Sequence, residues 1–131
     1  MAISWNIDPQ MGDLGVIEFN NLDFVPRRVY WITNFVPGVK RGFHAHKTLK
    51  QLMFVARGFV ELELKTGRES EHHVIYSSSS PLRVNPGVWR EFGSSDPSTV
   101  LVVLCDQPFD DSDYIRNFDE YLSWFRLKNE N

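Results

Sequence analysis

Two histidines one residue apart are the part of this sequence best suited to chemistry. His44 and His46 lie in residues 38–58, which read GVKRGFHAHKTLKQLMFVARG. On a β-strand, residues two apart point to the same side, so both imidazoles would face one pocket. Such a pair could bind a metal ion or transfer protons near neutral pH. Two ordinary histidines at a strand edge remain the simpler alternative.

Basic residues flank the two histidines. Arg41 and Lys47 could supply positive potential at the mouth of such a pocket. Arginine binds phosphate through a planar fork, whereas lysine acts as a point charge. His72 and His73 are adjacent and would point to opposite faces of a strand, so we interpret them as surface residues. The acidic cluster before the C-terminal segment, which includes Asp113, is expected to cap and solvate rather than bind a metal ion.

The elements that must position these residues are short strands. Segments with alternating or continuous apolar residues are separated by Gly, Pro, Asn and Ser turns about every eight to twelve residues, which indicates an all-β sandwich or barrel. The pattern predicts strands at 14–19, 29–35, 51–56, 59–65, 69–76, 82–85, 88–92 and 99–105, the last one central. Arg57-Gly58 would close a hairpin between two of them, and Thr66-Gly67 would make the next turn.

The C-terminal segment has a helical pattern instead. Its apolar residues recur at spacings of three and four, which places one apolar stripe on a helix over about 112–128, packed on the outside of the barrel. Ser112 or Asp113 would cap it. The stripe residues are Tyr114, Ile115, Phe118, Tyr121, Leu122 and Phe125.

Length and composition exclude several classes. The 131 residues make one domain, 1–131, with a net charge of −3, so a basic nucleic-acid surface is not expected. The single cysteine, Cys105, excludes an internal disulfide framework and suits a reducing compartment. The sequence contains neither a signal-peptide pattern nor an apolar run of membrane-spanning length. We therefore expect a cytoplasmic protein with no membrane contact.

The histidine segment resembles the first cupin motif. Gly38, His44, His46 and Gly58 occupy the motif's places, but the place of its Glu holds Gln51. Residues 85–90 (NPGVWR) resemble the second motif, with Arg90 in the place of its His. An arginine has no lone pair to donate and its charge repels a cation, so we predict no metal.

Four segments narrow the resemblance to the WxcM-like cupins, the dTDP-sugar 3,4-ketoisomerases. They are residues 29–32 (VYWI), 41–47 (RGFHAHK), Pro86 with Trp89, and 111–116 (DSDYIR), and together the similarity runs over residues 28–122. The resemblance implies a small cupin, a jelly-roll-like β-barrel with a C-terminal α-helix. It also implies conversion of dTDP-4-keto-6-deoxy-D-glucose to a 3-keto sugar, without a cofactor, on the way to 3-amino-3,6-dideoxy sugars. Family members are typically homodimers with exchanged strands.

The resemblance also implies roles for individual residues. His44 matches a catalytic base, His46 a second active-site histidine, and Tyr30 a candidate proton carrier. Arg41 matches an arginine near the nucleotide-sugar. Three further residues are candidates for substrate binding: Lys47 for the diphosphate, Trp89 as a pocket wall or as core, and Arg90, which departs from the family's commoner His.

Three other functions remain open from the sequence. The first is a metal-dependent cupin such as a dioxygenase, which Gln51 and Arg90 oppose. The second is a cupin that binds a nucleotide-sugar without catalysis. The third is a related nucleotide-sugar epimerase, which would also use a histidine base. The sequence does not determine the configuration of the product at C4.

Overall fold

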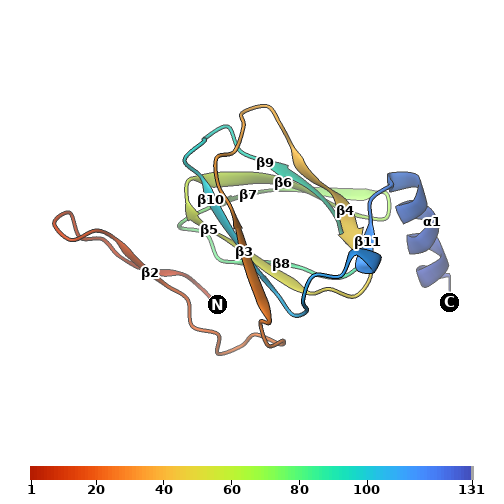
Figure 1. Cartoon of the computed structure of the whole chain (residues 1–131), viewed down its shortest axis with the longest axis horizontal. Coiled ribbons are helices and arrows are strands. Elements are labelled where there is room, and N and C mark those ends of the chain that lie inside the picture. Colours follow the sequence, from red (N-terminus) through yellow and green to blue (C-terminus); the bar gives the residue numbers. More distant parts are fainter. Residues whose placement is uncertain (131) are drawn as a thin grey trace.

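Two antiparallel sheets face each other and form the body of the protein (Figure 1). The computed structural model describes residues 1–130. A four-stranded sheet has the order β3-β10-β5-β8, and a five-stranded sheet has the order β11-β4-β9-β6-β7. Their strands are β3 (Arg28–Ile32), β4 (Arg41–His46), β5 (Gln51–Arg57), β6 (Phe59–Thr66), β7 (Glu69–Tyr76), β8 (Leu82–Val84), β9 (Trp89–Gly93), β10 (Val100–Cys105) and β11 (Tyr114–Ile115).

The N-terminal segment forms a separate hairpin. β1 (Ser4–Asn6) pairs with β2 (Leu14–Val16), and this two-stranded sheet projects away from the body (Figure 1). The hairpin is hydrogen-bonded to the body through the Trp5 indole, which donates to the carbonyl of Ser77 at 2.7 Å. Most side chains of the hairpin are exposed, and Met11 and Leu14 are 87% and 60% exposed. The hairpin therefore presents apolar surface that the body does not cover.

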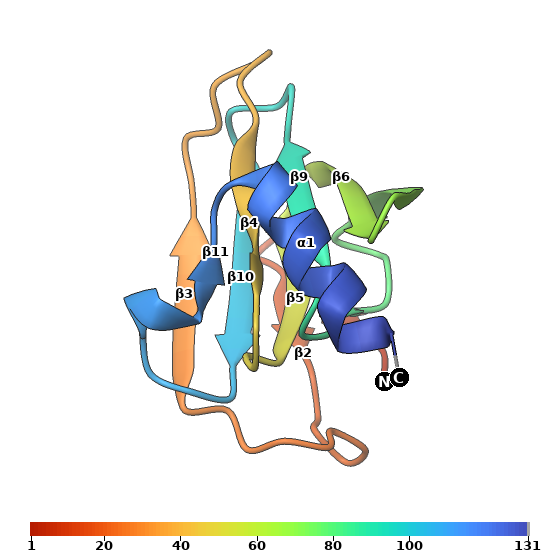
Figure 2. The ribbon, with the colours of Figure 1, turned by 90° about the vertical axis from the view of Figure 1, so that its right-hand side faces the viewer.

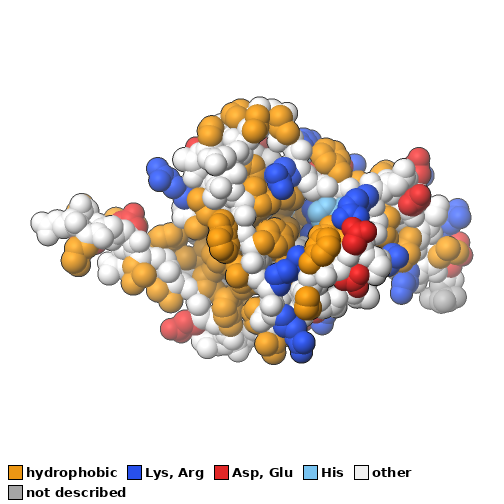
Figure 3. Space-filling model, viewed as in Figure 1, with side chains coloured by type: hydrophobic (Ala, Val, Ile, Leu, Met, Phe, Trp, Pro, Cys, Tyr) orange, Lys and Arg blue, Asp and Glu red, His pale blue; other side chains and the backbone are white. Residues whose placement is uncertain are grey.

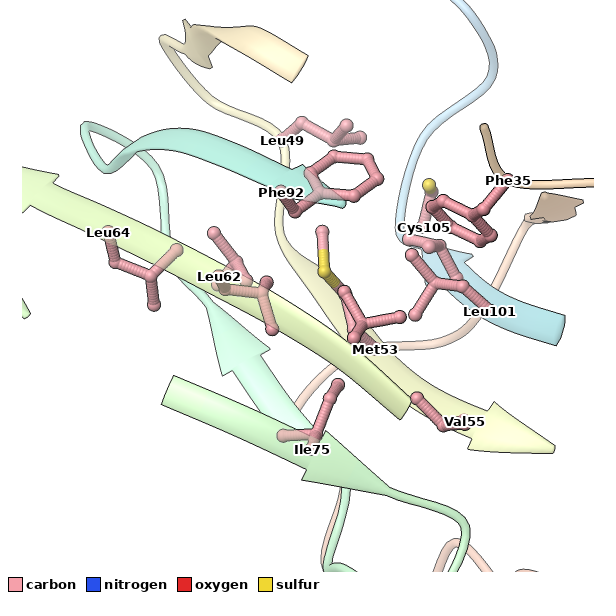
Figure 4. Close-up of a cluster of buried hydrophobic side chains, with 13 residues drawn as sticks. Phe35, Leu49, Met53, Val55, Leu62, Leu64, Ile75, Phe92, Leu101 and Cys105 are labelled. Carbon is pink, nitrogen blue, oxygen red and sulfur yellow. The ribbon is translucent and has the colours of Figure 1, made fainter. Parts of the chain in front are cut away.

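The hydrophobic core lies between the two large sheets. Side chains from both sheets, including Met53 and Leu101 from one and Leu62 and Phe92 from the other, are buried against each other (Figure 4). The alternation in β6 puts Val60, Leu62 and Leu64 into this core. The predicted all-β fold with a C-terminal helix is confirmed, and β10 is internal to its sheet as predicted.

The predicted hairpin at Arg57-Gly58 is wrong. β5 pairs with β10 and β8, whereas β6 pairs with β7 and β9, so the chain crosses from one sheet to the other at this point. Gly58 makes the corner with φ of +81°, and a Cβ there would overlap the hydroxyl of Thr99. A left-handed glycine thus turns the chain out of its sheet instead of pairing the two strands.

The helix begins later than predicted. A 3-10 turn (Asp111–Asp113) and strand β11 come first, and α1 spans Phe118–Asn129 with Asn117 as its N-cap, which accepts from the amide of Glu120 at 3.0 Å. Tyr114 and Ile115 are therefore strand residues, because β11 pairs with the end of β4. Ser112 and Asp113 do not cap this helix. Within residues 1–130, no helix combines the length and apolar character that a membrane crossing needs.

α1 packs across the outer face of the five-stranded sheet (Figure 2). Tyr121, which is fully buried, anchors it in a cluster with Ala45, Trp89 and Ile115. The Tyr121 hydroxyl accepts from the amide of Gly67 at 3.0 Å and can donate to the carbonyl of Gly87 at 2.7 Å. The helix is thus tied to two turns of the sheet by one hydroxyl.

Tyr121→Phe should therefore destabilise the protein by about 1–3 kcal/mol, because it leaves buried backbone groups without a partner. Urea unfolding followed by circular dichroism measures the loss. Tyr76→Phe is the matched control, since Tyr76 is 51% exposed. Equal stability of the two variants would contradict this role for Tyr121.

Candidate active site

His44 sits just after a distortion of strand β4. Its pairing with β9 shifts register between Gly42 and His44, and both Gly42 and Phe43 have positive φ, at 94° and 55°. A Cβ on Gly42 would lie 2.7 Å from the carbonyl oxygen of Arg90, so only glycine fits there. This distortion brings Nδ1 of His44 to 3.0 Å from the carbonyl oxygen of Gly42. Because a carbonyl only accepts, Nδ1 carries the proton and Nε2 keeps a free lone pair.

His46 is held by a carboxylate in the interior. It is 1% exposed, and its Nδ1 donates to Oδ2 of Asp113 at 3.1 Å. Asp113 also accepts from the amide and hydroxyl of Thr48, each at 2.8 Å. Burial opposes ionisation of Asp113, but these hydrogen bonds from Thr48 hold its pKa below the usual value. His46 is therefore fixed with its proton on Nδ1.

The two imidazoles share one site, as their spacing predicts. Their ring centroids are 4.9 Å apart and nearly perpendicular. The Tyr114 ring completes the cluster, at 4.9 Å from His44 and 4.3 Å from His46. Tyr114 reaches them because it pairs with His46 across β11 and β4.

Sequence patterns missed Asp113 and Tyr114 as site residues. The sequence pattern predicts both at the start of the helix, Asp113 as a cap and Tyr114 in the apolar stripe. The signal that could have found them is the segment 111–116, which already belongs to the family resemblance. A period of three and four does not distinguish a helix from a short strand that precedes one.

Arg90 and Gln51, which occupy two cupin ligand places, bond to each other. The Arg90 guanidinium is 1% exposed and donates to Oε1 of Gln51 and, at 3.2 Å, to the carbonyl of Val88. Nε2 of Gln51 lies 3.2 Å from the Tyr30 hydroxyl oxygen. Within residues 1–130, no three His, Cys, Asp or Glu side chains are grouped as a metal ion would require.

Burial and the nearby Arg90 charge both lower the pKa of the two histidines. Burial lowers the pKa of His44 to about 4, and the Arg90 charge adds to the effect. Burial, then Arg90, lowers the pKa of His46 as well. Arg90 itself stays charged at neutral pH, although burial lowers its pKa to about 10. Burial raises the pKa of Tyr30, so its phenol keeps its proton. At pH 7 the site thus contains two neutral imidazoles, the buried Arg90 cation and the ionised Asp113 carboxylate.

A surface pocket of about 510 Å³ opens onto this cluster. Its walls come from both sheets: Arg28, Tyr30, Ile32, Arg41, Gly42, Phe43, His44, Phe92 and Tyr114. This size suits a small organic ligand. The space-filling view shows histidine atoms on this face, bordered by basic and hydrophobic side chains (Figure 3). A larger groove of about 780 Å³ beside α1 contains neither histidine nor tyrosine.

The candidate residues divide into three groups. Tyr30, Arg41 and His44 line the pocket, whereas His46 and Arg90 lie buried near it. Lys47 and Trp89 do not line this pocket. Lys47, the residue after His46, donates to the carbonyl of Ser112 at 3.3 Å. Trp89 precedes Arg90 on β9, so it points to the opposite face of the sheet and is buried under α1. Arg28, which was not a candidate, does line it, with its guanidinium 5.6 Å from the centre of the Tyr30 ring.

Known proteins with similar sequences include a curated enzyme. TDP-4-oxo-6-deoxy-alpha-D-glucose-3,4-oxoisomerase from Aneurinibacillus thermoaerophilus is 35% identical over 123 residues, which cover 91% of this chain and 88% of that protein.

Two solved structures have the same fold. A mutant of the 3,4-ketoisomerase QdtA from Thermoanaerobacterium thermosaccharolyticum, in complex with TDP-4-keto-6-deoxyglucose, is 31% identical with a TM-score of 0.87 over 99% of this chain and 94% of that one. WlaRB, a TDP-quinovose 3,4-ketoisomerase from Campylobacter jejuni, is 31% identical. Its TM-score is 0.80, and the match covers 93% of this chain and 94% of that one.

The family comparison covers nearly the whole chain. The family described as "WxcM-like, C-terminal" matches residues 2–126. This match, the curated relative and the solved structures agree with one another. The chain therefore belongs to the WxcM-like, C-terminal family.

Proposed function

We propose that this protein is a sugar 3,4-ketoisomerase that converts dTDP-4-keto-6-deoxy-D-glucose to a dTDP-3-keto-6-deoxyhexose. The observation that carries the proposal is His44: a neutral imidazole in a pocket wall, with its only proton on Nδ1 and a free lone pair on Nε2. The curated relative, at 35% identity, is named for an oxoisomerase of the same keto sugar.

The reaction needs a base and a proton donor but no redox cofactor. A base removes the proton from C3, next to the C4 carbonyl, and the electrons of that C–H bond form an enediolate. A proton returned to C4, a proton delivered to O4 and the loss of the proton on O3 then leave the ketone at C3 and a hydroxyl at C4. The oxidation is internal to the sugar, so only protons move between protein and substrate.

The pocket offers one residue for each task. We assign the base to His44, because it lines the pocket whereas His46 is buried behind it. Tyr30 would protonate the developing oxyanion. His46, fixed by Asp113, would assist as the second proton carrier in contact with His44. Arg41, with Arg28, would bind the diphosphate at the rim, since arginine matches phosphate oxygens.

We also propose a pathway and a location. A 3-keto-6-deoxy sugar is the substrate that a transaminase would need to make a 3-amino-3,6-dideoxy sugar. A cytoplasmic location suits Cys105, a buried free thiol that a reducing compartment would preserve.

His44→Asn should lower kcat at least about 100-fold, because it removes the base and leaves the fold intact. Proton NMR of the keto sugar in deuterated buffer measures both turnover and the deuterium that the wild-type protein places at C4. His72→Asn is the matched control, since His72 is an exposed histidine on β7 and should behave as wild type.

The same spectra separate the other functions. A substrate that binds without exchange or turnover would contradict the isomerase and support a binding protein. A product that keeps its ketone at C4 but is inverted at a neighbouring carbon would support an epimerase. Unchanged activity in His44→Asn would remove His44 from the proton path.

Activity should persist in weakly acidic buffer. The base must be neutral, and with a pKa of about 4 it stays neutral as the pH falls to 5.5. A histidine of ordinary pKa would be neutral in roughly one-tenth of molecules at that pH. We therefore expect kcat/KM at pH 5.5 to be nearly that at pH 7.5, with the loss centred near pH 4. A tenfold fall by pH 5.5, with the circular dichroism spectrum unchanged, would contradict the assignment.

We further propose a homodimer in which N-terminal strands are exchanged. β3 is an edge strand of its sheet among the described residues, and its outward side chains Val29 and Trp31 are 49% and 65% exposed. An apolar edge of this kind invites pairing with another chain. The projecting β1-β2 hairpin of a second copy offers exposed apolar residues to meet it.

Trp31→Glu should therefore shift the protein from dimer to monomer in analytical ultracentrifugation at micromolar concentration, because it places a charge in the apolar contact. Leu127→Glu is the control, since Leu127 is equally exposed at 65% but lies on α1. A monomeric wild-type protein, or equal dissociation of both variants, would contradict this interface.

A further inference from the structure

The orientation of one buried amide follows from its neighbours. Arginine has only donors, so the group of Gln51 that faces Arg90 must be the carbonyl oxygen Oε1. The amino group Nε2 therefore points the other way, to the Tyr30 hydroxyl at 3.2 Å and the Cys105 sulfur at 3.4 Å. Gln51 is 1% exposed, so water does not offer it another arrangement. Arg90 thus fixes which end of the amide Tyr30 meets.

The Gln51 amide also determines the direction in which the Tyr30 hydroxyl can donate its hydrogen. Because Nε2 is a donor, the Tyr30 oxygen must accept from it, and its own hydrogen must point elsewhere. No acceptor for that hydrogen lies within hydrogen-bond distance in the described part of the chain. Tyr30 lines the pocket, so the free direction for the hydrogen is toward a bound ligand.

We infer that Gln51, held by Arg90, is a positioning residue that presents Tyr30 to the substrate as a proton donor. The inference rests on the proposed function. Tyr30 and Gln51 come from β3 and β5 of one sheet, and Arg90 comes from β9 of the facing sheet. Gln51 and Arg90 stand in the places of the Glu and His ligands of the cupin motifs. In this arrangement they orient Tyr30 instead of binding a metal ion.

The proton balance closes within the pocket. As the enediolate forms, the O–H bond of Tyr30 breaks and its proton goes to O4 of the sugar. The proton that His44 took from C3, or a solvent proton exchanged for it, is then delivered to C4. As it arrives, the phenolate takes the proton from O3, which re-forms the tyrosine and leaves the ketone at C3. The amide of Gln51 donates to the phenolate in between, and Arg90 polarises that amide from behind. No co-reactant is needed.

Gln51→Glu tests this arrangement with almost no change of shape. A carboxylate only accepts, so Tyr30 would have to donate to it, and the proton would turn away from the pocket. The charged pair with Arg90 should keep the protein folded. We expect kcat to fall roughly 10- to 100-fold with KM changed less than about threefold. In a Tyr30→Phe background, the same substitution should have no further effect.

Gln51→Met provides the comparison, since it keeps the volume but neither donates nor accepts strongly. It should lower kcat less than Gln51→Glu, because the Tyr30 hydroxyl can still turn toward substrate. A merely structural role would make the two variants alike. Equal kcat losses in the wild-type and Tyr30→Phe backgrounds would overturn the inference.

Side-chain amide NMR tests the contact without any turnover. The Gln51 NH₂ resonances, identified by their loss in Gln51→Glu, should shift in Tyr30→Phe. Unchanged resonances would overturn the positioning contact itself. If Tyr30→Phe shifts these resonances but the wild-type protein does not isomerise the keto sugar, the proposed function is overturned while the contact stands. The two failures are therefore distinguishable.

Discussion

A buried arginine organises this site. Arg90 places a positive charge between the two sheets, where it donates to Gln51 and to a backbone carbonyl. Burial of a charge is costly, and here the hydrogen bonds offset only part of that cost, since Nε of Arg90 has no partner within residues 1–130. The charge of Arg90 also lowers the pKa of His44 and His46. It thereby helps keep both imidazoles neutral at pH 7 and able to accept protons.

The backbone around Arg90 is shaped to accept it. The left-handed residues at Gly42 and Phe43 displace strand β4, so that its histidines lie beside Arg90 on β9 without a clash at Gly42. Strand β11 adds Asp113, which fixes the proton of His46, and Tyr114, which covers both imidazoles. Local strain in β4 and a two-residue edge strand thus determine the geometry of the two histidines. The hydrophobic cluster under α1, to which β4 contributes Ala45 and β11 contributes Ile115, keeps both elements in place.

Apolar patterns predict eight strands, and seven of them lie in the two large sheets, where they have buried or half-buried side chains. The eighth is β2, which is exposed throughout. The patterns could not say which strands pair: Gly58 carries the chain between sheets, although its sequence is typical of a hairpin. Spacing predicted that His44 and His46 share a site. It did not place Asp113 and Tyr114 there, since a strand of two residues has no period to detect. Lys47 and Trp89 are close to site residues in sequence, yet Trp89 is buried under α1 and Lys47 lies beside Trp124 and Phe125 of that helix.

Nitrogen-15 NMR of the imidazoles in the resting protein tests the central claim most directly. The account predicts that His44 and His46 are neutral from pH 5.5 to 8, with the proton on Nδ1 and Nε2 unprotonated in both rings. Assignment by His44→Asn and His46→Asn would distinguish the two rings. An imidazolium signal from His44 at pH 6.5, or a proton on its Nε2, would contradict the account, because the ring would then have no lone pair in the pocket to remove a proton from the sugar.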